Sequence, residues 1–283
     1  MSAVQFKAKP NLEGGTMVAA FHGWNDGGEA ATTAATYVRD RWGAQKFAGL
    51  DPEDFYDFQV SRPMVRLEEG VTRQIDWPGN DFYHASLPTR QMAVLIGVEP
   101  NVRWRTFTTD IVDAARSLGV KKMVTLGAFL ADVPHSVPPP VAGSAPTQEM
   151  AERLGVVPSR YEGPTGIVGV LQDAAARAGM ESVSLWAAVP HYLPAGTNPK
   201  AALALVQRLS AYLDMSVETD QLARAAATWE TQVATMIEEN EELGEYVKRL
   251  EEGVRDRGEL EMPSGDALAA ELERFLRERE DPS

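Results

Sequence analysis

The sequence predicts an α/β protein, with a mainly parallel sheet over residues 1–215 and an acidic helical extension over residues 216–283. Short apolar runs alternate with helical patterns, which is typical of strand-helix-strand units. Proline and aromatic residues become scarcer after Asp214, which marks a change in composition. The last 68 residues hold 19 acidic and 8 basic side chains, so most of the chain's net charge of -14 falls there.

Four apolar runs predict the parallel strands, and helical patterns predict the segments between and after them. The expected strands are Met17–Phe21, Ala93–Val98, Met123–Leu126 and Val183–Val189. The expected helices are Glu29–Arg41, Phe107–Leu118, Ile167–Ala178 and Lys200–Leu213. Between Phe47 and Tyr83 we expect inserted hairpin strands, at Gln59–Arg62 and Val65–Leu67. Five prolines between Pro134 and Pro146 predict a loop.

Composition excludes several classes of function. A net charge of -14 disfavours nucleic acids and anionic membrane surfaces, because both are bound mainly by Lys and Arg. No run of 18 apolar residues and no signal-peptide pattern is visible, so we expect a cytoplasmic protein. The absence of cysteine excludes disulfides, thiolate metal sites and Cys nucleophiles. We expect neither a metal nor a cofactor.

A heptad stripe runs through the acidic extension. Apolar residues follow steps of four and three, with one polar member, at Leu222, Ala226, Trp229, Val233, Met236, Asn240, Leu243, Val247, Leu250 and Val254. The stripe predicts either a helix packed on its own domain or a seam between subunits, where an Asn at a seam position would fix the register. Gly244 and Gly253 weaken the helix. A second, shorter helix is expected after Ser264, with Leu268, Leu272, Phe275 and Leu276 on one face.

A glycine-rich turn follows the first strand, and its candidate binding residues are His22, Gly23, Trp24, Asn25, Asp26, Gly27 and Gly28. Glycines between a strand and a helix permit close approach of a ligand or of another chain. The alternative is structural, with the glycines forming the turn and Asp26 capping the next helix.

A second glycine-containing segment precedes the helix at Ile167, and its candidate binding residues are Gly163, Pro164, Thr165 and Gly166. An anion could dock at that helix N-terminus. Equally, the glycines could let this helix pack closely against the first turn.

Three histidines, His22, His135 and His191, follow predicted strands at the ends where open parallel sheets bind ligands. Asp26, Glu99 and Asp132 lie at comparable positions, so acid-base chemistry is conceivable there. Structural or surface histidines are the simpler interpretation, and we assign no catalytic residue.

Three segments together resemble the PAC2 family, which is named for a proteasome assembly chaperone. They are Phe21-His22-Gly23-Trp24-Asn25-Asp26-Gly27-Gly28, Tyr161-Glu162-Gly163-Pro164-Thr165-Gly166 and Val189-Pro190-His191-Tyr192. The resemblance covers about residues 15–213, and the acidic tail resembles that of actinobacterial members. It implies a three-layer αβα core similar to purine nucleoside phosphorylases, without established catalysis.

The resemblance also implies function. We expect a non-enzymatic protein-interaction module and a homo-oligomer, first of all a trimer, with proteasome α subunits as candidate partners. Proteasome-binding relatives often end in a hydrophobic residue, Tyr and any residue, whereas this chain ends Glu280-Asp281-Pro282-Ser283. The rival expectation is a small-molecule-binding protein or enzyme, a nucleoside hydrolase or phosphorylase or a carboxylate ligase, that uses a cleft at the strand ends.

Overall fold

The structure is a computed structural model that describes residues 2–68, 72–145, 147–154, 157–158, 162–193 and 196–257. The expected helix around Leu268 to Leu276 and the last four residues of the chain lie outside this part.

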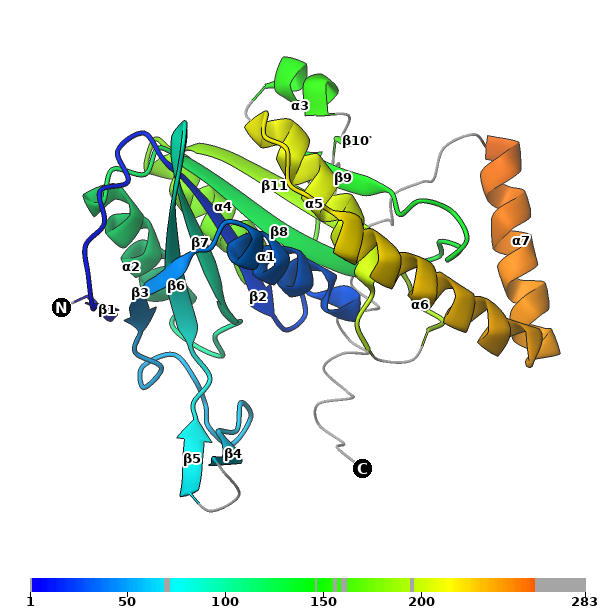
Figure 1. Ribbon diagram of the computed structural model, residues 1–283, viewed down its shortest axis with the longest axis horizontal. Helices are drawn as coiled ribbons and strands as arrows, with labels where there is room; N and C mark the ends of the chain where they lie inside the picture. The colour runs from blue at the N-terminus through cyan, green and yellow to red at the C-terminus, as the bar shows by residue number, and fades with distance from the viewer. Residues whose placement is uncertain are drawn as a thin grey trace.

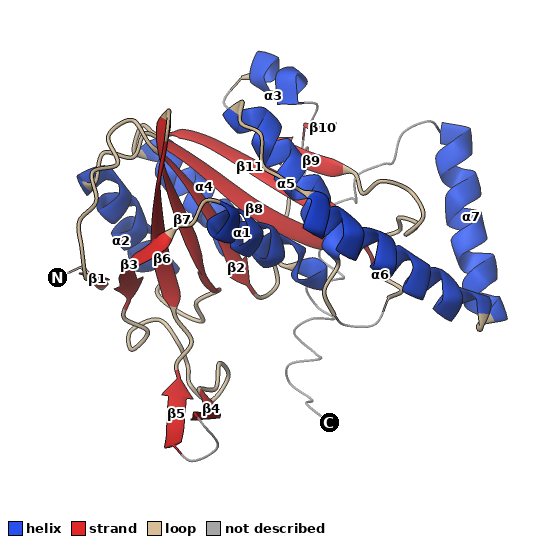
Figure 2. Ribbon diagram, viewed as in Figure 1, coloured by secondary structure: helices blue, strands red, loops and turns tan. Residues whose placement is uncertain are grey.

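A nine-stranded sheet forms the centre of the molecule, in the order β1-β3-β6-β7-β2-β8-β11-β9-β10 (Figures 1 and 2). The strands are β1 (Val4–Phe6), β2 (Thr16–His22), β3 (Gln45–Leu50), β6 (Asn80–Leu87), β7 (Arg90–Val98), β8 (Lys122–Ala131), β9 (Val141–Ser144), β10 (Val157–Pro158) and β11 (Glu181–Pro190). The central strands β7, β2, β8 and β11 are parallel, whereas β6, β3, β1 and β9 each join an antiparallel neighbour. The prediction of an α/β fold with a parallel centre is confirmed.

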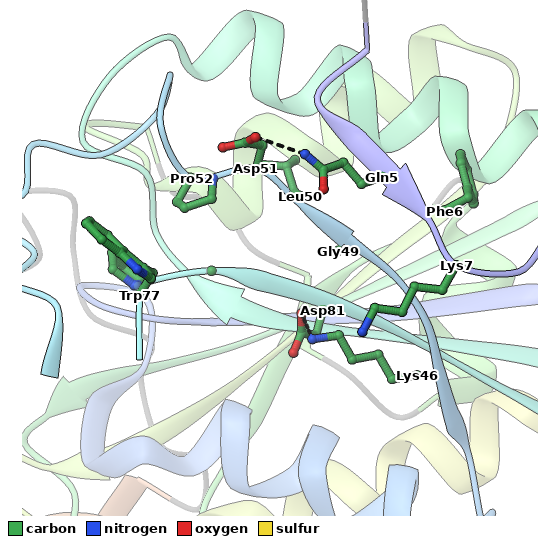
Figure 3. Close-up of a pocket in the computed structure, with 12 residues that line it drawn as sticks. Gln5, Phe6, Lys7, Lys46, Gly49, Leu50, Asp51, Pro52, Trp77 and Asp81 are labelled. Carbon is green, nitrogen blue, oxygen red and sulfur yellow. Dashed lines mark hydrogen bonds and ion pairs between the residues drawn. The ribbon is translucent and has the colours of Figure 1, made fainter. Parts of the chain in front are cut away.

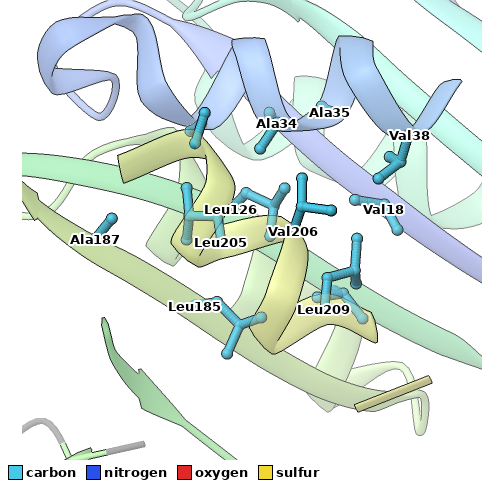
Figure 4. Packing of buried hydrophobic residues seen from close by; sticks show 14 of the residues in the cluster. Val18, Ala34, Ala35, Val38, Leu126, Leu185, Ala187, Leu205, Val206 and Leu209 are labelled. Carbon is cyan, nitrogen blue, oxygen red and sulfur yellow. The ribbon is translucent and has the colours of Figure 1, made fainter. Parts of the chain in front are cut away.

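Helices cover both faces of this sheet, and α6 and α7 continue beyond it. They are α1 (Ala30–Arg41), α2 (Trp104–Ser117), α3 (Gln148–Leu154), α4 (Ile167–Arg177), α5 (Pro199–Leu213), α6 (Asp220–Glu238) and α7 (Glu241–Arg257). Along β2, Val18 and Ala20 point into the core under α1 and α5, and Met17 and Phe21 point into the core under α2 and α4. This alternation gives three layers. Figure 4 shows α1 and α5 packed on the first face, with Val206 of α5 among the buried side chains.

The inserted hairpin lies further along the chain than expected. A separate two-stranded sheet consists of β4 (Met64–Glu68) and β5 (Thr72–Asp76). Val65–Leu67 is therefore a strand as predicted, whereas a strand at Gln59–Arg62 was wrong, because that segment forms turns. The flanking strands β3 and β6 belong to the main sheet, where each lies between two other strands. Both are only partly buried and show weak apolar alternation, so the sequence did not predict them.

The proline-rich loop contains a strand that the sequence did not predict. Val141–Ser144 forms β9 and pairs antiparallel with β11. These four residues lie between Pro140 and Pro146 and contain no proline, so each keeps the backbone N–H that a ladder needs. The loop prediction was wrong for this short segment.

The acidic extension does not form one continuous helix. α6 ends at Glu238, and the Asn240 side chain accepts a hydrogen bond from the Leu243 backbone N–H at 3.1 Å, which caps α7. Asn side chains compete with helical hydrogen bonds and favour such caps, so the one polar seam position is where the helix breaks. The expectation of one unbroken helix through Asn240 was therefore wrong.

The apolar stripe faces the protein itself. Leu222, Ala226, Val233 and Val247 are buried, and the remaining apolar stripe residues are partly buried: Trp229, Met236, Leu243, Leu250 and Val254. The N-terminal part of α6 packs on α5, with Leu222 in the same core as Leu209. Of the two alternatives for the stripe, the structure has the helix packed on its own domain.

Candidate functional site

The carboxyl ends of β2, β7, β8 and β11 meet at one edge of the sheet, because these four strands are parallel. The loops that leave this edge contain all the histidines and carboxylates that the sequence predicted at the strand ends. The structure divides these candidates into two groups, one around Asp26 and Glu99 and one around Asp132.

Asp26 is the polar centre of the turn after β2. Its Oδ1 accepts the backbone N–H groups of Ala31 at 2.8 Å and Thr32 at 3.1 Å, which caps α1. Its Oδ2 accepts the Thr32 hydroxyl and lies 3.4 Å from Nδ1 of His22. Asp26 is buried, while the His22 side chain is 50% exposed. The structural alternative for this carboxylate, a helix cap, is what the structure shows.

Gly28 allows the same turn to approach another element closely. It has φ of 56°, and a Cβ there would lie 2.9 Å from Cβ of Asn198. The Gly28 carbonyl accepts a 2.7 Å hydrogen bond from the Asn198 backbone N–H. The Asn198 side chain then caps α5 by accepting from the Ala201 N–H at 2.9 Å. The turn thus connects the starts of α1 and α5.

The two glycine-containing segments meet, although 141 residues separate their most closely packed members, Asn25 and Gly166. Asn25 is buried, and its Nδ2 donates to Glu99 Oε1 at 2.7 Å. The same oxygen accepts the Ile167 backbone N–H at 2.8 Å, so a carboxylate occupies the N-terminus of α4. A Cβ on Gly166 would lie 2.2 Å from the Asn25 amide. Gly163, Pro164 and Thr165 are exposed beside this junction, and Trp24 is half-buried.

The second group lies where α7 packs against the loops after β8 and β11. Asp132 Oδ1 accepts the Tyr246 hydroxyl at 2.9 Å and lies 3.1 Å from Nδ1 of His191. The rings of His191 and Tyr192 each lie within 6 Å of the Tyr246 ring. Burial, and then the hydrogen bond to Asp132, raise the pKa of Tyr246 to about 12. The helical extension thus covers the ends of β8 and β11, which are part of the edge at which the sequence predicted a cleft.

His135 is buried in this second group. Its backbone N–H donates to the Tyr192 hydroxyl at 2.8 Å, and its carbonyl accepts from Lys200 Nζ at 2.6 Å. Burial, and then the Lys200 charge, lower the pKa of His135. Lys200 also pairs with Glu230 of α6 at 2.8 Å, so this histidine belongs to the contacts that fix the extension.

Thr32, Asn198 and Tyr246 take part in these networks but were not predicted from the sequence. The pair Asn198-Pro199 carried a usable signal, because Asn at the cap position and Pro at the first helical position mark a helix start. Tyr246 carried no such sequence signal, because its partner Asp132 lies more than a hundred residues away in the chain.

A separate hollow of about 430 Å³ lies at the β1–β3 edge of the sheet (Figure 3). Within it Lys46 pairs with Asp81 at 2.7 Å, and Gln5 donates to Asp51 at 2.9 Å. Trp77 lines one side. Within the described ranges, the structure places no group of three or more His, Asp or Glu side chains suited to a metal ion, and no helix long and apolar enough to cross a bilayer.

Loss of the Tyr246 hydroxyl tests the docking of α7. We expect Tyr246→Phe to cost about 0.5–1 kcal/mol locally, which makes opening of α7 about two to five times more frequent. Hydrogen exchange of the α7 amides measures this change. Tyr37→Phe is the matched control, because the Tyr37 hydroxyl donates to the Glu218 carbonyl just before α6. Equal exchange of α7 in Tyr246→Phe and in the unmodified chain would contradict the docking contact.

The hydrogen bond to Asp26, ahead of opposing burial, raises the pKa of His22 above its ordinary 6.5. A raised folded-state pKa stabilises the fold fully below pH 6.5, and this contribution disappears as the pH rises through the folded value. We expect NMR titration of the His22 ring to give a pKa above 6.5 that falls in Asp26→Asn. An unchanged His22 pKa in that variant would show that Asp26 is not the cause.

The chain was compared with known families and structures. The family profile of PAC2 matches residues 20–237, which extends beyond the resemblance noted above into α6. A crystal structure from Mycobacterium tuberculosis, described as a proteasome-assembly chaperone homologue, is 44% identical with a TM-score of 0.75; the match covers 82% of this chain and 99% of that one. A PAC2 family protein from Streptomyces avermitilis is 42% identical, with a TM-score of 0.74 and the same coverage.

A further comparison concerns the fold alone. A Mycobacterium tuberculosis protein of unknown function is 24% identical, with a TM-score of 0.82, and the match covers 98% of this chain and 96% of that one. No curated protein matches. The family match spans most of the chain and agrees with two relatives above 40% identity. This chain belongs to the PAC2 family.

Proposed function

We propose that this chain is a non-enzymatic, cytoplasmic protein-interaction module that acts as an assembly chaperone on proteasome α subunits. The 44% identical mycobacterial relative, described as a proteasome-assembly chaperone homologue, supports this function. We also propose that the chain is a homo-oligomer, with a trimer as the first expectation.

One structural observation carries the non-enzymatic part of the proposal. The carboxylates at the strand ends hold the protein's own elements: Asp26 caps α1, Glu99 joins Asn25 to the start of α4, and Asp132 holds Tyr246 of α7. Carboxylates used in this way hold loops and helices in place, which supports a structural role for them rather than a catalytic one.

Reconstitution with the α subunits of the same organism tests the chaperone function. We expect the full chain to co-purify with these subunits and to speed the appearance of assembled α rings on native gels. An unrelated acidic protein of similar size, added at the same concentration, controls for nonspecific effects. No binding above background together with an unchanged assembly rate would overturn the chaperone function.

A ligand-binding or catalytic function is the second candidate, and the His22–Asp26 pair favours it. A buried carboxylate that orients one imidazole nitrogen while the ring stays half exposed is an arrangement used for general base catalysis. A thermal-shift screen with nucleosides, phosphate, small carboxylates and metals tests it. A ligand at 100 times its Kd adds about 2.7 kcal/mol of stability. No shift with any of these compounds would count against this candidate.

A further inference from the structure

The β4–β5 ribbon, residues 64–68 and 72–76, projects from the body of the molecule (Figures 1 and 2). Its register pairs Val65 with Ile75 and Leu67 with Arg73. Side chains alternate between the faces of a strand, so these four share one face. The opposite face carries Met64, Arg66, Gln74 and Asp76.

The two faces of the ribbon differ in whether their side chains have partners within the chain. On the opposite face, Arg66 bonds to both Asp76 and Gln74 at 2.7 Å. On the first face, Val65, Leu67 and Ile75 are 54–61% exposed, and we name these three side chains the apolar face. A two-stranded ribbon is only marginally stable alone in water, so the ribbon needs a lasting cover on this face.

We propose that the apolar face of the ribbon packs against a second copy of this chain. A lasting cover requires a partner that is always present, and another copy is present at the same concentration as the chain itself. Charge supports this choice. Residues 59–77 contain three arginines and three acidic residues, whereas the whole chain carries -14. The ribbon is therefore a neutral segment that an acidic copy repels least.

The size of the ribbon indicates where on the second copy it lies. Five-residue strands are about 17 Å long, and two of them span about 10 Å, so one face offers roughly 200 Å². A stable interface buries about 800 Å² on each partner. Two ribbons packed face to face would fall well short of this area, so each ribbon lies on the body of its neighbour. Every copy then gives one ribbon and receives one, as in a symmetric dimer or in a closed head-to-tail ring such as the proposed trimer.

The apolar surface continues from the ribbon to its root. Trp77, directly after β5, is 53% exposed and packs edge-on against Phe58 at 4.8 Å between ring centroids. Val60, in the same loop as Phe58, is 52% exposed. These side chains enlarge the contact that a neighbouring body can cover. The inference rests on the proposed homo-oligomer and adds the surface that forms it.

Light scattering coupled to gel filtration of the full chain tests this interface. We expect the unmodified chain to be oligomeric and Val65→Lys to associate at least tenfold more weakly. Met64→Lys is the matched control, because Met64 is 69% exposed and apolar but lies on the opposite face, and it is expected to remain oligomeric. An oligomer that Val65→Lys leaves intact would overturn the ribbon interface alone, whereas a monomeric unmodified chain would overturn the oligomer as well.

A labelling experiment covers the case in which Val65→Lys fails to fold. The chain contains no cysteine, so a single Leu67→Cys reports on one position. We expect a maleimide to react with this cysteine at least tenfold more slowly at high protein concentration than after dilution to the monomer. Met64→Cys is expected to react at similar rates in both conditions. Equal rates for Leu67→Cys in both conditions would overturn the proposal.

Discussion

Replacement of Asp26 by alanine is expected to lower the free energy of unfolding by about 3 kcal/mol. The variant loses the cap of α1 and leaves the Thr32 hydroxyl and the backbone N–H groups of Ala31 and Thr32 without their acceptor inside the protein. Urea denaturation at pH 7 measures the change. Since domains of ordinary stability have about 5–15 kcal/mol in total, such a loss is a large fraction.

Asp26→Asn is the control for this prediction. Asn caps helices about as well as Asp, so most of the stability is expected to remain, while the negative charge beside His22 is lost. A loss below 0.5 kcal/mol in Asp26→Ala, within the usual range of surface substitutions, would contradict the cap.

Replacement of Gly166 by alanine is expected to cost about 1–3 kcal/mol, mainly for a steric reason. Gly166 has φ of -96° and ψ of -174°, which alanine adopts readily, so backbone strain contributes nothing. The new Cβ would lie 2.2 Å from the Asn25 amide and would force apart the Asn25–Glu99–α4 junction. Thermal and urea denaturation measure the loss.

Two controls separate this clash from a general effect of glycine replacement. Gly244→Ala in α7 places its Cβ 3.7 Å from the nearest atom and is expected to stabilise that helix by up to about 1 kcal/mol. In a double-mutant cycle, Asn25→Ala removes the clashing side chain, so the two substitutions are expected to be non-additive. Additive losses would show that Gly166 and Asn25 do not interact.

Local patterns were sufficient to predict the parallel core. The four apolar runs became β2, β7, β8 and β11, because buried parallel strands are nearly continuous apolar segments. Strand β9 could not be predicted in this way, since its pairing with β11 depends on contacts about 40 residues away and its neighbours are prolines. Strands β3 and β6 were missed for another reason, because their partly buried sequences show too little apolar alternation.

Sequence position identified the strand-end residues, but it could not say what they contact. Asp26 could be interpreted as a helix cap and Gly166 as a site of close packing between helix and turn. Both interpretations need only local rules. The contact of α7 with Asp132 depends on where the chain turns after α6. The heptad stripe continues unchanged through Asn240, so periodicity alone gave no sign of the helix break there.

The order of strands in the sheet has a consequence for synthesis of the chain. Strand β2 emerges early, yet its ladder partners are Met92–Val98 of β7 and Lys122–Thr125 of β8. Its six buried residues, Thr16–Phe21, therefore have no ladder partner until the ribosome has added about 75 more residues, and the second partner follows only after about a hundred. During that interval the nascent chain displays a strand with two open apolar faces, which slows folding and makes this segment the natural target of general folding factors.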